Sequence, residues 1–444
     1  MTGLKNNKKV IRSWAFFDWA NSAYNLVITS TIFPAYYTII TTTPEHGDKV
    51  NFFGLTFVNT ALSNYALAAA YLVIALISPL LSSMADHKGN KKIYMKLFTW
   101  MGALSCCGLY FFKLETLELG IICFVLAAIG YAGGFVFYNS YLPEIASPDQ
   151  QDAVSAKGFS YGYIGSVLLQ LICFVFVLKP EWFGITDLSF PPRLSFLLVG
   201  LWWVGFAQIP FKVLPKGSPN FNAAEQKKIS SGFVELQKVW SQVKEMTLMK
   251  RFLLAFFCYS MGVQTVMLAA AGFGQKILNL PTSSLIAVIL IIQLVAIAGA
   301  NLMSRLSKTY GNVNVLIAVV LLWIIMCICA YFVATAIQFY ILAAIVGLVM
   351  GGVQSLSRST YAKLIPENTA DTASFFSFYD VTEKLAIVAG LASFAYIEEL
   401  TGSMRNSTIA LTVFFMAGLL VLLSLKRAAA GLIVVPVRSV DKNI

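Results

Sequence analysis

Charged residues are scarce in this chain. Asp, Glu, Lys and Arg make up 12% of its 444 residues, whereas a soluble globular protein carries roughly 25%. Hydrophobic residues make up 58%, and the mean hydropathy is +0.74. A soluble fold of this length cannot bury so much apolar surface, so the composition excludes a soluble protein and predicts one whose solvent is lipid.

Residues and motifs of common enzymes are also missing. The only histidines are His46 and His87, which excludes a Ser/His/Asp set in the apolar segments and a histidine-supported zinc site. The chain has no G-x-x-x-x-G-K-[ST] loop, so ATP is not expected to supply energy. All seven cysteines lie in apolar segments and are expected to be buried thiols rather than disulfides. We therefore expect no enzyme activity, no metal and no cofactor.

The net charge of +11 raises the question of nucleic-acid binding. The basic residues, however, fall between apolar runs rather than on one basic face, which argues against a nucleic-acid partner. The partners expected instead are membrane lipid and a small-molecule solute.

Twelve apolar runs are long enough to cross a bilayer, which needs about 20 residues. The first carries Asp18 and Asn21 and is too long for the apolar part of a signal peptide, so we interpret it as an uncleaved span. The predicted spans are residues 14–40, 60–84, 93–112, 119–141, 158–179, 194–214, 251–274, 283–304, 313–334, 337–362, 374–397 and 406–426. The fold class predicted is an all-α membrane protein with twelve transmembrane helices.

The distribution of Lys and Arg predicts the orientation. If the N-terminus is cytoplasmic, only six of the 32 basic residues lie outside. These are Lys49, Lys113, Lys179, Arg193, Lys276 and Arg405. Both termini are therefore expected in the cytoplasm, and the plasma (inner) membrane is the expected location.

A long inner segment divides the spans six and six. We predict an N-terminal six-helix bundle at residues 1–213, a cytoplasmic linker at 214–250, and a C-terminal bundle with a short tail at 251–444. Within the linker, Ile229, Phe233, Leu236, Trp240 and Val243 share one face of an amphipathic helix. That helix is expected on the membrane surface or under the bundle, as a tether or a regulatory element.

Short strings recur between the two halves. Pro143-Glu144 after span 4 corresponds to Pro366-Glu367 after span 10, an offset of 223. Gly89-Asn90 after span 2 corresponds to Gly311-Asn312 after span 8, an offset of 222. Because duplicated halves are common in transporters, the strings favour two pseudo-repeated six-helix bundles.

Span 1 carries polar residues on one face. A charge at the centre of a spanning helix costs about 2.5–3.5 kcal/mol, so such residues must face the protein interior. Asp18, Asn21, Ser22, Asn25 and Thr29 have helical spacing and predict one wall of a water-filled cavity. Asn21 and Asn25 are candidate substrate ligands. Asp18 lies about four residues into the span and is either a functional acid or a carboxylate stabilised by the helix dipole.

Span 11 carries three charges. Asp380 and Lys384 are spaced i, i+4 with the acid first, the favourable order for a pair. If Asp380 and Lys384 pair, Glu383 has no basic partner, and a buried carboxylate without a partner can carry a proton. The alternative is a neutralised structural network.

Spans 4, 7 and 10 supply the remaining candidate substrate ligands. Gln354 and Arg358 share a face of span 10, and arginine can hold a carboxylate through two parallel hydrogen bonds. Arg358 lies near the inner end and could instead extend to the membrane surface. Tyr138, Asn139 and Gln264 are either ligands or polar contacts between helices.

Several strings resemble the major facilitator superfamily. The turn M-A-D-H-K-G-N-K-K from Met84 is similar to the superfamily signature between the second and third helices, although Ser82 stands where that motif has glycine. The strings W-A-F-F-D-W-A-N-S-A-Y from Trp14 and G-G-V-Q-S-L-S-R-S from Gly351 resemble the UMF1 branch, which includes the autophagy-related vacuolar amino-acid effluxers of fungi.

The resemblance implies the major facilitator fold and a secondary carrier that works by alternating access. A resemblance at the level of the fold is a poor guide to the substrate. It implies amino-acid export coupled to protons, by a monomer. Asp86, with Lys91 and Lys92, would belong to a cytoplasmic latch that stabilises one state. Met261 stands where the family has an acidic residue in span 7, which moves the expected coupling role to Asp18 and Glu383.

Two other functions remain open on the sequence alone. The 14% aromatic content is compatible with export of amphiphilic compounds. A non-transporting membrane scaffold or sensor is a different class, but it has no need for a polar stripe or for intramembrane charges.

Overall fold

The first crossing is a continuous rod made of three helical pieces. In the computed structural model, which describes residues 5–216, 232–367, 369 and 371–433, α1 (Lys8–Tyr24) passes into a π-helix η1 (Asn25–Ile32) and then α2 (Phe33–Thr41). The π-helical part has hydroxyl-to-carbonyl bonds across five residues, from Ser30 to Asn25 and from Thr31 to Leu26. A π-helix widens each turn, so side chains beyond it change face relative to an α-helix.

Five further crossings complete the first half. A hairpin of β1 (Lys49–Phe52) and β2 (Leu55–Val58) precedes them, turning at Phe53 and Gly54, which both have positive φ. The helices are α3 (Asn59–Lys88), α4 (Lys91–Gly108), α5 (Leu117–Ser140), α7 (Gln151–Leu178) and α8 (Phe190–Val213). The short pieces are η2 (Leu109–Phe111), η3 (Leu114–Thr116), α6 (Leu142–Ile145) and η4 (Pro180–Phe183).

Six crossings form the second half, which begins after the linker helix α9 (Gly232–Glu245). They are α10 (Thr247–Leu278), α11 (Thr282–Tyr310), α12 (Asn312–Phe332), α13 (Ala336–Leu364), α14 (Thr372–Thr401) and α15 (Met404–Ile433). The break between α12 and α13 is set by Thr335, which caps α13 reciprocally with Gln338. Every predicted span therefore coincides with a helical crossing in the described chain.

Nine of the helices in the described residues are long and apolar enough to cross a membrane by composition alone. The other three crossings miss that criterion for local reasons. The first is divided by its π-helix, the 18 residues of α4 contain three lysines (Lys91, Lys92 and Lys96), and α14 carries Asp380, Glu383 and Lys384 near its middle. Large apolar side chains such as Leu72, Leu104 and Ile172 are exposed on the outside, as expected where helices meet lipid.

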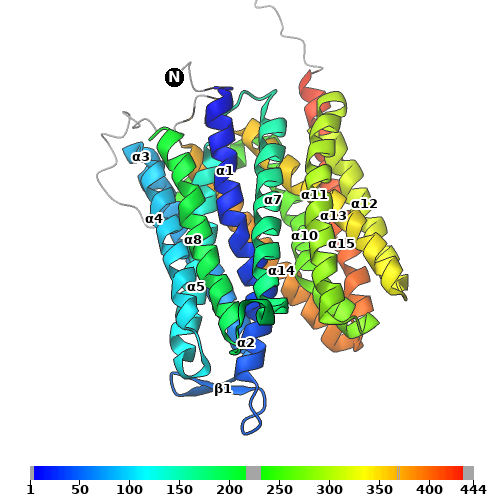
Figure 1. Cartoon of the computed structure of the whole chain (residues 1–444). Helices are drawn as coiled ribbons and strands as arrows, with labels where there is room; N and C mark the ends of the chain where they lie inside the picture. Colours follow the sequence, from blue (N-terminus) through cyan, green and yellow to red (C-terminus); the bar gives the residue numbers. More distant parts are fainter. Residues whose placement is uncertain (1–4, 217–231, 368, 370, 434–444) are drawn as a thin grey trace, which may run out of the picture.

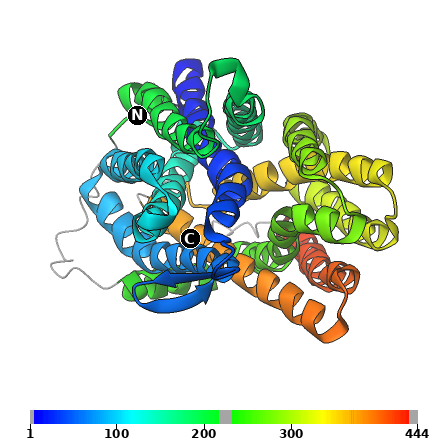
Figure 2. The same ribbon diagram turned by 60° about the horizontal axis from the view of Figure 1, so that its bottom comes forward.

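The two halves lie side by side (Figures 1 and 2). Helices α3, α5 and α7 of the first half pack against α11, α13 and α14 of the second. We call the end where α1 begins and α15 ends the terminal face, and the end with the β1–β2 hairpin the hairpin face (Figure 1).

The linker helix α9 packs against α3, α10 and α14. Val243 is buried and Trp240 stacks on Phe378 of α14, with ring centroids 5.8 Å apart. The amphipathic helix thus lies under the bundle, one of the two predicted places. Ile229 lies outside the described residues, and the second bundle begins at Thr247, four residues before the predicted boundary.

Candidate functional site

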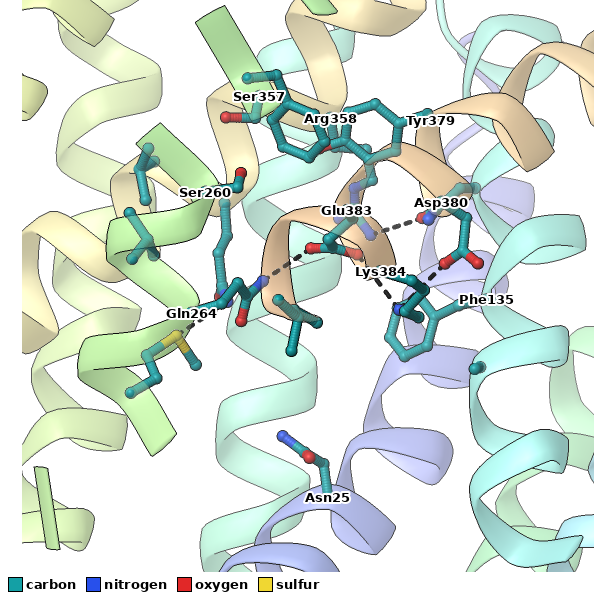
Figure 3. A pocket seen from close by; sticks show the side chains of 18 of the residues that line it. Asn25, Phe135, Ser260, Gln264, Ser357, Arg358, Tyr379, Asp380, Glu383 and Lys384 are labelled. Carbon is teal, nitrogen blue, oxygen red and sulfur yellow. Dashed lines mark hydrogen bonds and ion pairs between the residues drawn. The ribbon is translucent and has the colours of Figure 1, made fainter. Parts of the chain in front are cut away.

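A cavity of about 180 Å³ lies between the two halves, near the middle of the crossings. Its walls come from η1, α3, α5, α7, α10, α13 and α14, with aromatic and polar side chains intermixed (Figure 3). The predicted site residues that line it are Asn25, Asn139, Gln264, Gln354, Arg358, Asp380, Glu383 and Lys384. Asp18, Asn21, Tyr138 and Asp86 lie outside its lining.

The charges of α14 form a cluster on one wall of the cavity (Figure 3). The Lys384 Nζ lies 3.2 Å from Asp380 Oδ1 and 3.5 Å from Glu383 Oε2. Gln264 of α10 donates from Nε2 to Glu383 Oε1 at 2.8 Å. The expectation that Glu383 is left without a partner is therefore wrong, because one lysine reaches both acids. The carboxylate oxygen without a hydrogen-bond partner is Oδ2 of Asp380.

Of the five residues of the predicted stripe on span 1, Asn25 lines the cavity, whereas Asp18, Asn21 and Ser22 lie in α1, before the π-helix, and do not. Asn25 lines the cavity together with Ser30, five residues on, whereas Thr29 does not. Asn21 is fully buried beside Gly134 of α5, and its side-chain amide has no hydrogen-bond partner among the described residues. The stripe was predicted with α-helical spacing, and the wider π turn moves the polar face by one residue.

Asp18 and Arg358 form an ion pair between the halves. Arg358 Nη1 lies 3.5 Å from Asp18 Oδ2, and the two side chains are 2% and 1% exposed. Helix α1 begins at Lys8, so Asp18 is well inside it and the proposed interaction with the helix dipole is wrong. Arg358 does not extend to the membrane surface either.

The Arg358 guanidinium uses most of its donors within the protein. It donates to Ser155 Oγ at 2.9 Å, to the Ser155 carbonyl at 2.7 Å and to Asn139 Oδ1 at 3.2 Å. It also lies over the rings of Trp14 and Phe159, 5.0 and 4.1 Å from their centroids. In this conformation Arg358 joins the halves, and few donors remain for a substrate carboxylate.

Glycines of α7 make room for this pair. A Cβ on Gly162 would lie 2.8 Å from Asp18 Oδ1, and one on Gly158 would lie 2.6 Å from the Tyr138 hydroxyl. Tyr138 stacks on Trp14 with centroids 4.3 Å apart and donates to Asp18 Oδ2 at 3.2 Å. Tyr138 is thus a partner of Asp18 rather than part of the cavity wall. Neither glycine was among the predicted site residues.

Asp86 contacts the second half at the terminal face. Its carboxylate accepts from the backbone N–H groups of Ala373 and Ser374, at 3.1 and 2.8 Å, at the start of α14. Nearby, Lys91 binds Glu144 and donates to Thr372 at 2.9 Å. A carboxylate at a helix N-terminus is stabilised by free N–H groups and by the helix dipole. Lys92, in contrast, donates to the Leu214 carbonyl of its own half.

A second polar cluster at the terminal face surrounds Asp152 of α7. Its carboxylate accepts from Ser307 at 3.0 Å and from Asn312 at 2.7 Å, and lies 2.6 Å from Lys363 Nζ. Asp152 was not among the predicted site residues, although Gly311-Asn312 belonged to the repeat. The repeat offers a signal for it. Asp152 and Ser374 are 222 residues apart and so occupy equivalent positions in the two halves, and Ser374 binds Asp86.

Contacts between the halves are concentrated toward the terminal face. Besides the clusters above, Asn301 donates to Ser160 at 2.8 Å and Tyr163 donates to Gln354 at 2.6 Å. Among the polar contacts between the halves, the one nearest the hairpin face is the Lys384 ammonium over the Tyr71 ring, 5.3 Å from its centroid. Between there and the hairpin face, no hydrogen bond or ion pair joins the halves within the described ranges. These contacts close the cavity at the terminal face.

Comparison with protein families extends over nearly the whole chain. The family described as "Vacuole effluxer Atg22 like" matches residues 6–430. This chain belongs to that family. It is 30% identical over 420 residues to an MFS-type transporter of Bacillus subtilis (strain 168), YxiO, covering 94% of this chain and 95% of that one. It is 24% identical to autophagy-related protein 22-1 of Penicillium rubens, covering 83% of this chain and 76% of that one.

Two solved transporter structures share this fold. The human organic anion transporter MFSD10 superposes with a TM-score of 0.72 at 12% identity, covering 94% of this chain and 99% of that one. The transporter FucP in its outward conformation superposes with a TM-score of 0.70, also at 12% identity, covering 94% and 98%. The fold is therefore the major facilitator fold. The Atg22-like chain is an integral multi-pass membrane protein and a secondary transporter, not an enzyme.

Proposed function

We propose that this transporter carries amino acids across the membrane by alternating access and that proton movement drives it. The observation that carries the proposal is the cluster of Asp380, Glu383 and Lys384 in a cavity between two halves that are closed on one face. Charges at this depth are expensive in a membrane protein and are kept where a polar solute or a proton must bind.

Glu383 is the proposed proton carrier. Its side chain is 25% exposed, against 7% for Asp380, so water in the cavity reaches it more readily. Its partners, Gln264 of α10 and Lys384 of its own helix, can rearrange when the carboxylate is protonated. Protonation of Glu383 would weaken its attraction for the Lys384 ammonium. Because that ammonium also lies over the Tyr71 ring of α3, proton binding would change a contact between the halves.

Amino acids are proposed because the cavity offers both charges and neutral amides. Asn25, Gln264 and Gln354 can bind a zwitterion, and the family relatives include proteins described as vacuole effluxers. A single chain supplies all the residues that line the cavity. We therefore propose that the transporter works as a monomer.

The proposed cycle opens and closes the cavity at opposite faces. If the terminal face is cytoplasmic, as the distribution of Lys and Arg predicts, the present state is closed to the cytoplasm. We propose that Asp86 and the Asp152 cluster act as latches of this state, and that Asp18 and Arg358 must separate when the halves open at the terminal face.

Flux into proteoliposomes tests the proposed function. The purified protein would be assayed with labelled amino acids, with and without an imposed pH gradient, beside the Glu383→Gln variant. The matched control is Glu398→Gln, which neutralises an acid on the same helix that pairs with Lys276 near the hairpin face. We expect gradient-driven flux of at least one amino acid, lost in Glu383→Gln and retained in the control.

Other outcomes separate the alternatives. Flux that ignores both the gradient and Glu383→Gln would contradict proton coupling and leave a uniporter. Flux of amphiphilic compounds, with none for amino acids, would favour the exporter of amphiphiles instead. Transport of neither class would contradict the proposed substrate while leaving the family and fold in place.

A further inference from the structure

The charges around the central cavity do not balance. In the described structure, the charged side chains that line it or pair with a lining residue are Asp18, Arg358, Asp380, Glu383 and Lys384. These are three acids and two bases. Arg358 is matched by Asp18, so the cluster on α14 has two carboxylates for one ammonium group.

One carboxylate oxygen in this cluster is free. Asp380 lines the cavity with a side chain that is 7% exposed, and its Oδ2, itself buried, has no hydrogen-bond partner among the described residues. Its other oxygen binds Lys384, while both oxygens of Glu383 have partners. A buried carboxylate oxygen without a partner loses its hydration without compensation, and such groups in native proteins call for an explanation such as a functional role or a bound ion.

Bases in the cavity are, in contrast, already occupied. Arg358 is bound to Asp18, Ser155 and Asn139, and Lys384 lies between Asp380 and Glu383. An anionic ligand would find no free cation and would meet an excess of negative charge. A cationic group would meet the opposite conditions, because attraction between charges is strong where water is excluded.

The remaining walls suit a cation with an apolar body. Tyr71, Tyr131 and Phe135 line the same cavity, and aromatic faces attract ammonium groups. Lys384 already makes such a contact with Tyr71. Val263, Leu268 and Ile387 add aliphatic surface. A volume of about 180 Å³ is below the roughly 300–1,000 Å³ of pockets for drug-sized ligands, so the ligand is small.

We propose that the cavity recognises its solute by a protonated amine, which pairs with the Asp380 carboxylate next to Glu383. The inference rests on the proposed function, in that the cavity is taken as the transport site. It adds that the amine, rather than the carboxylate, is the group required for binding. Arg358 then has no part in holding the substrate and serves the contact between the halves.

Binding of three matched compounds to the purified full-length protein tests this proposal. L-leucine has an amine and a carboxylate, 3-methylbutylamine has only the amine, and 4-methylpentanoate has only the carboxylate. Affinities would be measured by calorimetry at pH 7 in detergent. We expect the two amines to bind and 4-methylpentanoate to bind at least about tenfold more weakly, since a charge-assisted contact is lost.

Two variants locate the amine. Asp380→Asn should weaken binding of leucine and of 3-methylbutylamine at least about tenfold, while Asp380→Glu should retain part of it. The control Glu398→Gln should bind both as the natural protein does. Equal affinity for 4-methylpentanoate and 3-methylbutylamine would overturn the proposal. An unchanged affinity of Asp380→Asn for the two amines, the result expected if Asp380 is always protonated, would also overturn it. Failure of both amines to bind the natural protein would overturn it as well.

The same compounds separate this proposal from the proposed function. If 3-methylbutylamine binds and is moved in proteoliposomes while no amino acid is, recognition of the amine stands and amino-acid transport fails. If amino acids are moved but 4-methylpentanoate competes better than 3-methylbutylamine, transport stands and the amine site fails.

Discussion

Asp18 and Arg358 lie on the first and tenth crossings and meet in the interior, each almost fully buried. Buried ion pairs contribute little net stability compared with apolar packing, because both charges lose their hydration. Removing one partner is different, because it leaves the other charge buried alone. The pair is therefore better understood as a device that holds the halves together in one state than as a general source of stability.

Arg358→Gln should lower thermal stability strongly. It leaves the Asp18 carboxylate buried without a cation, a loss of about 3–5 kcal/mol in buried pairs. Asp18→Asn should be milder, because Arg358 keeps Ser155 and Asn139. The measurement is the unfolding midpoint of each single variant and of the double variant in detergent. We expect the double variant to be more stable than Arg358→Gln alone, and simple addition of the two losses would contradict the pairing.

At the scale of elements, the start of α14 is held by the end of α3. Asp86 accepts two backbone N–H groups there and also the Ser374 hydroxyl at 2.9 Å. Asp152 plays the corresponding part at the start of α7, where it meets the ends of α11 and α13. Both acids belong to the first half, but they lie at opposite ends of their helices. Asp86 is at the end of the second crossing, whereas Asp152 is at the start of the fifth.

Loss of either latch should favour opening at the terminal face. Asp86→Asn and Asp152→Asn each remove charge-assisted hydrogen bonds that are worth about 1.5–3 kcal/mol. Spin labels at the exposed positions Lys88 and Lys308, in a cysteine-free background, would report the distance between the halves. We expect longer distances to become populated in both variants.

The matched control for the latches is Asp149→Asn. Asp149 is exposed on the same side, and its hydrogen bonds go to Ser147 and Gln150 of its own half. Its distances should match those of the natural protein. Unchanged distances in Asp86→Asn and Asp152→Asn would show that neither cluster closes this face.

At the scale of the whole molecule, orientation in the membrane comes from charge rather than from shape. Both ends of the described chain lie at the terminal face, where the Lys- and Arg-rich segments also gather. Positively charged loops are retained in the cytoplasm. We propose on this basis that the terminal face is cytoplasmic and the hairpin face is outside, in the plasma (inner) membrane.

Reporter fusions after Ile444 test that orientation in bacterial cells. A fluorescent protein that folds only in the cytoplasm should be bright, and an alkaline phosphatase that is active only outside should be inactive. A phosphatase inserted at Gly54, in the exposed hairpin turn, should be active and is the internal control. The reverse pattern of activities would place the termini outside and would reverse the state assigned to the closed cavity.

Much of the fold and part of the site follow from local chemistry. The twelve crossings were predictable because lipid demands about 20 apolar residues per helix. The cavity residues Asn25, Gln264 and Glu383 were predictable because polar groups are rare and costly in such helices. Of the first-helix stripe, Asn25 alone lines the cavity: Asp18, Asn21 and Ser22 lie in α1 and contact other helices or are buried, and Thr29 is replaced by Ser30 because the pattern assumed α-helical spacing where the chain forms a π-helix.

The sequence by itself determined the membrane class, the crossings, the division into halves and the family. Only the tertiary structure decided the partners: that Lys384 reaches both acids, that Asp380 keeps a free oxygen, and that Arg358 meets Asp18. The reason is physical. Crossing a bilayer is a property of a short segment, whereas the pairing of a buried charge depends on which distant helix packs against it and at what depth.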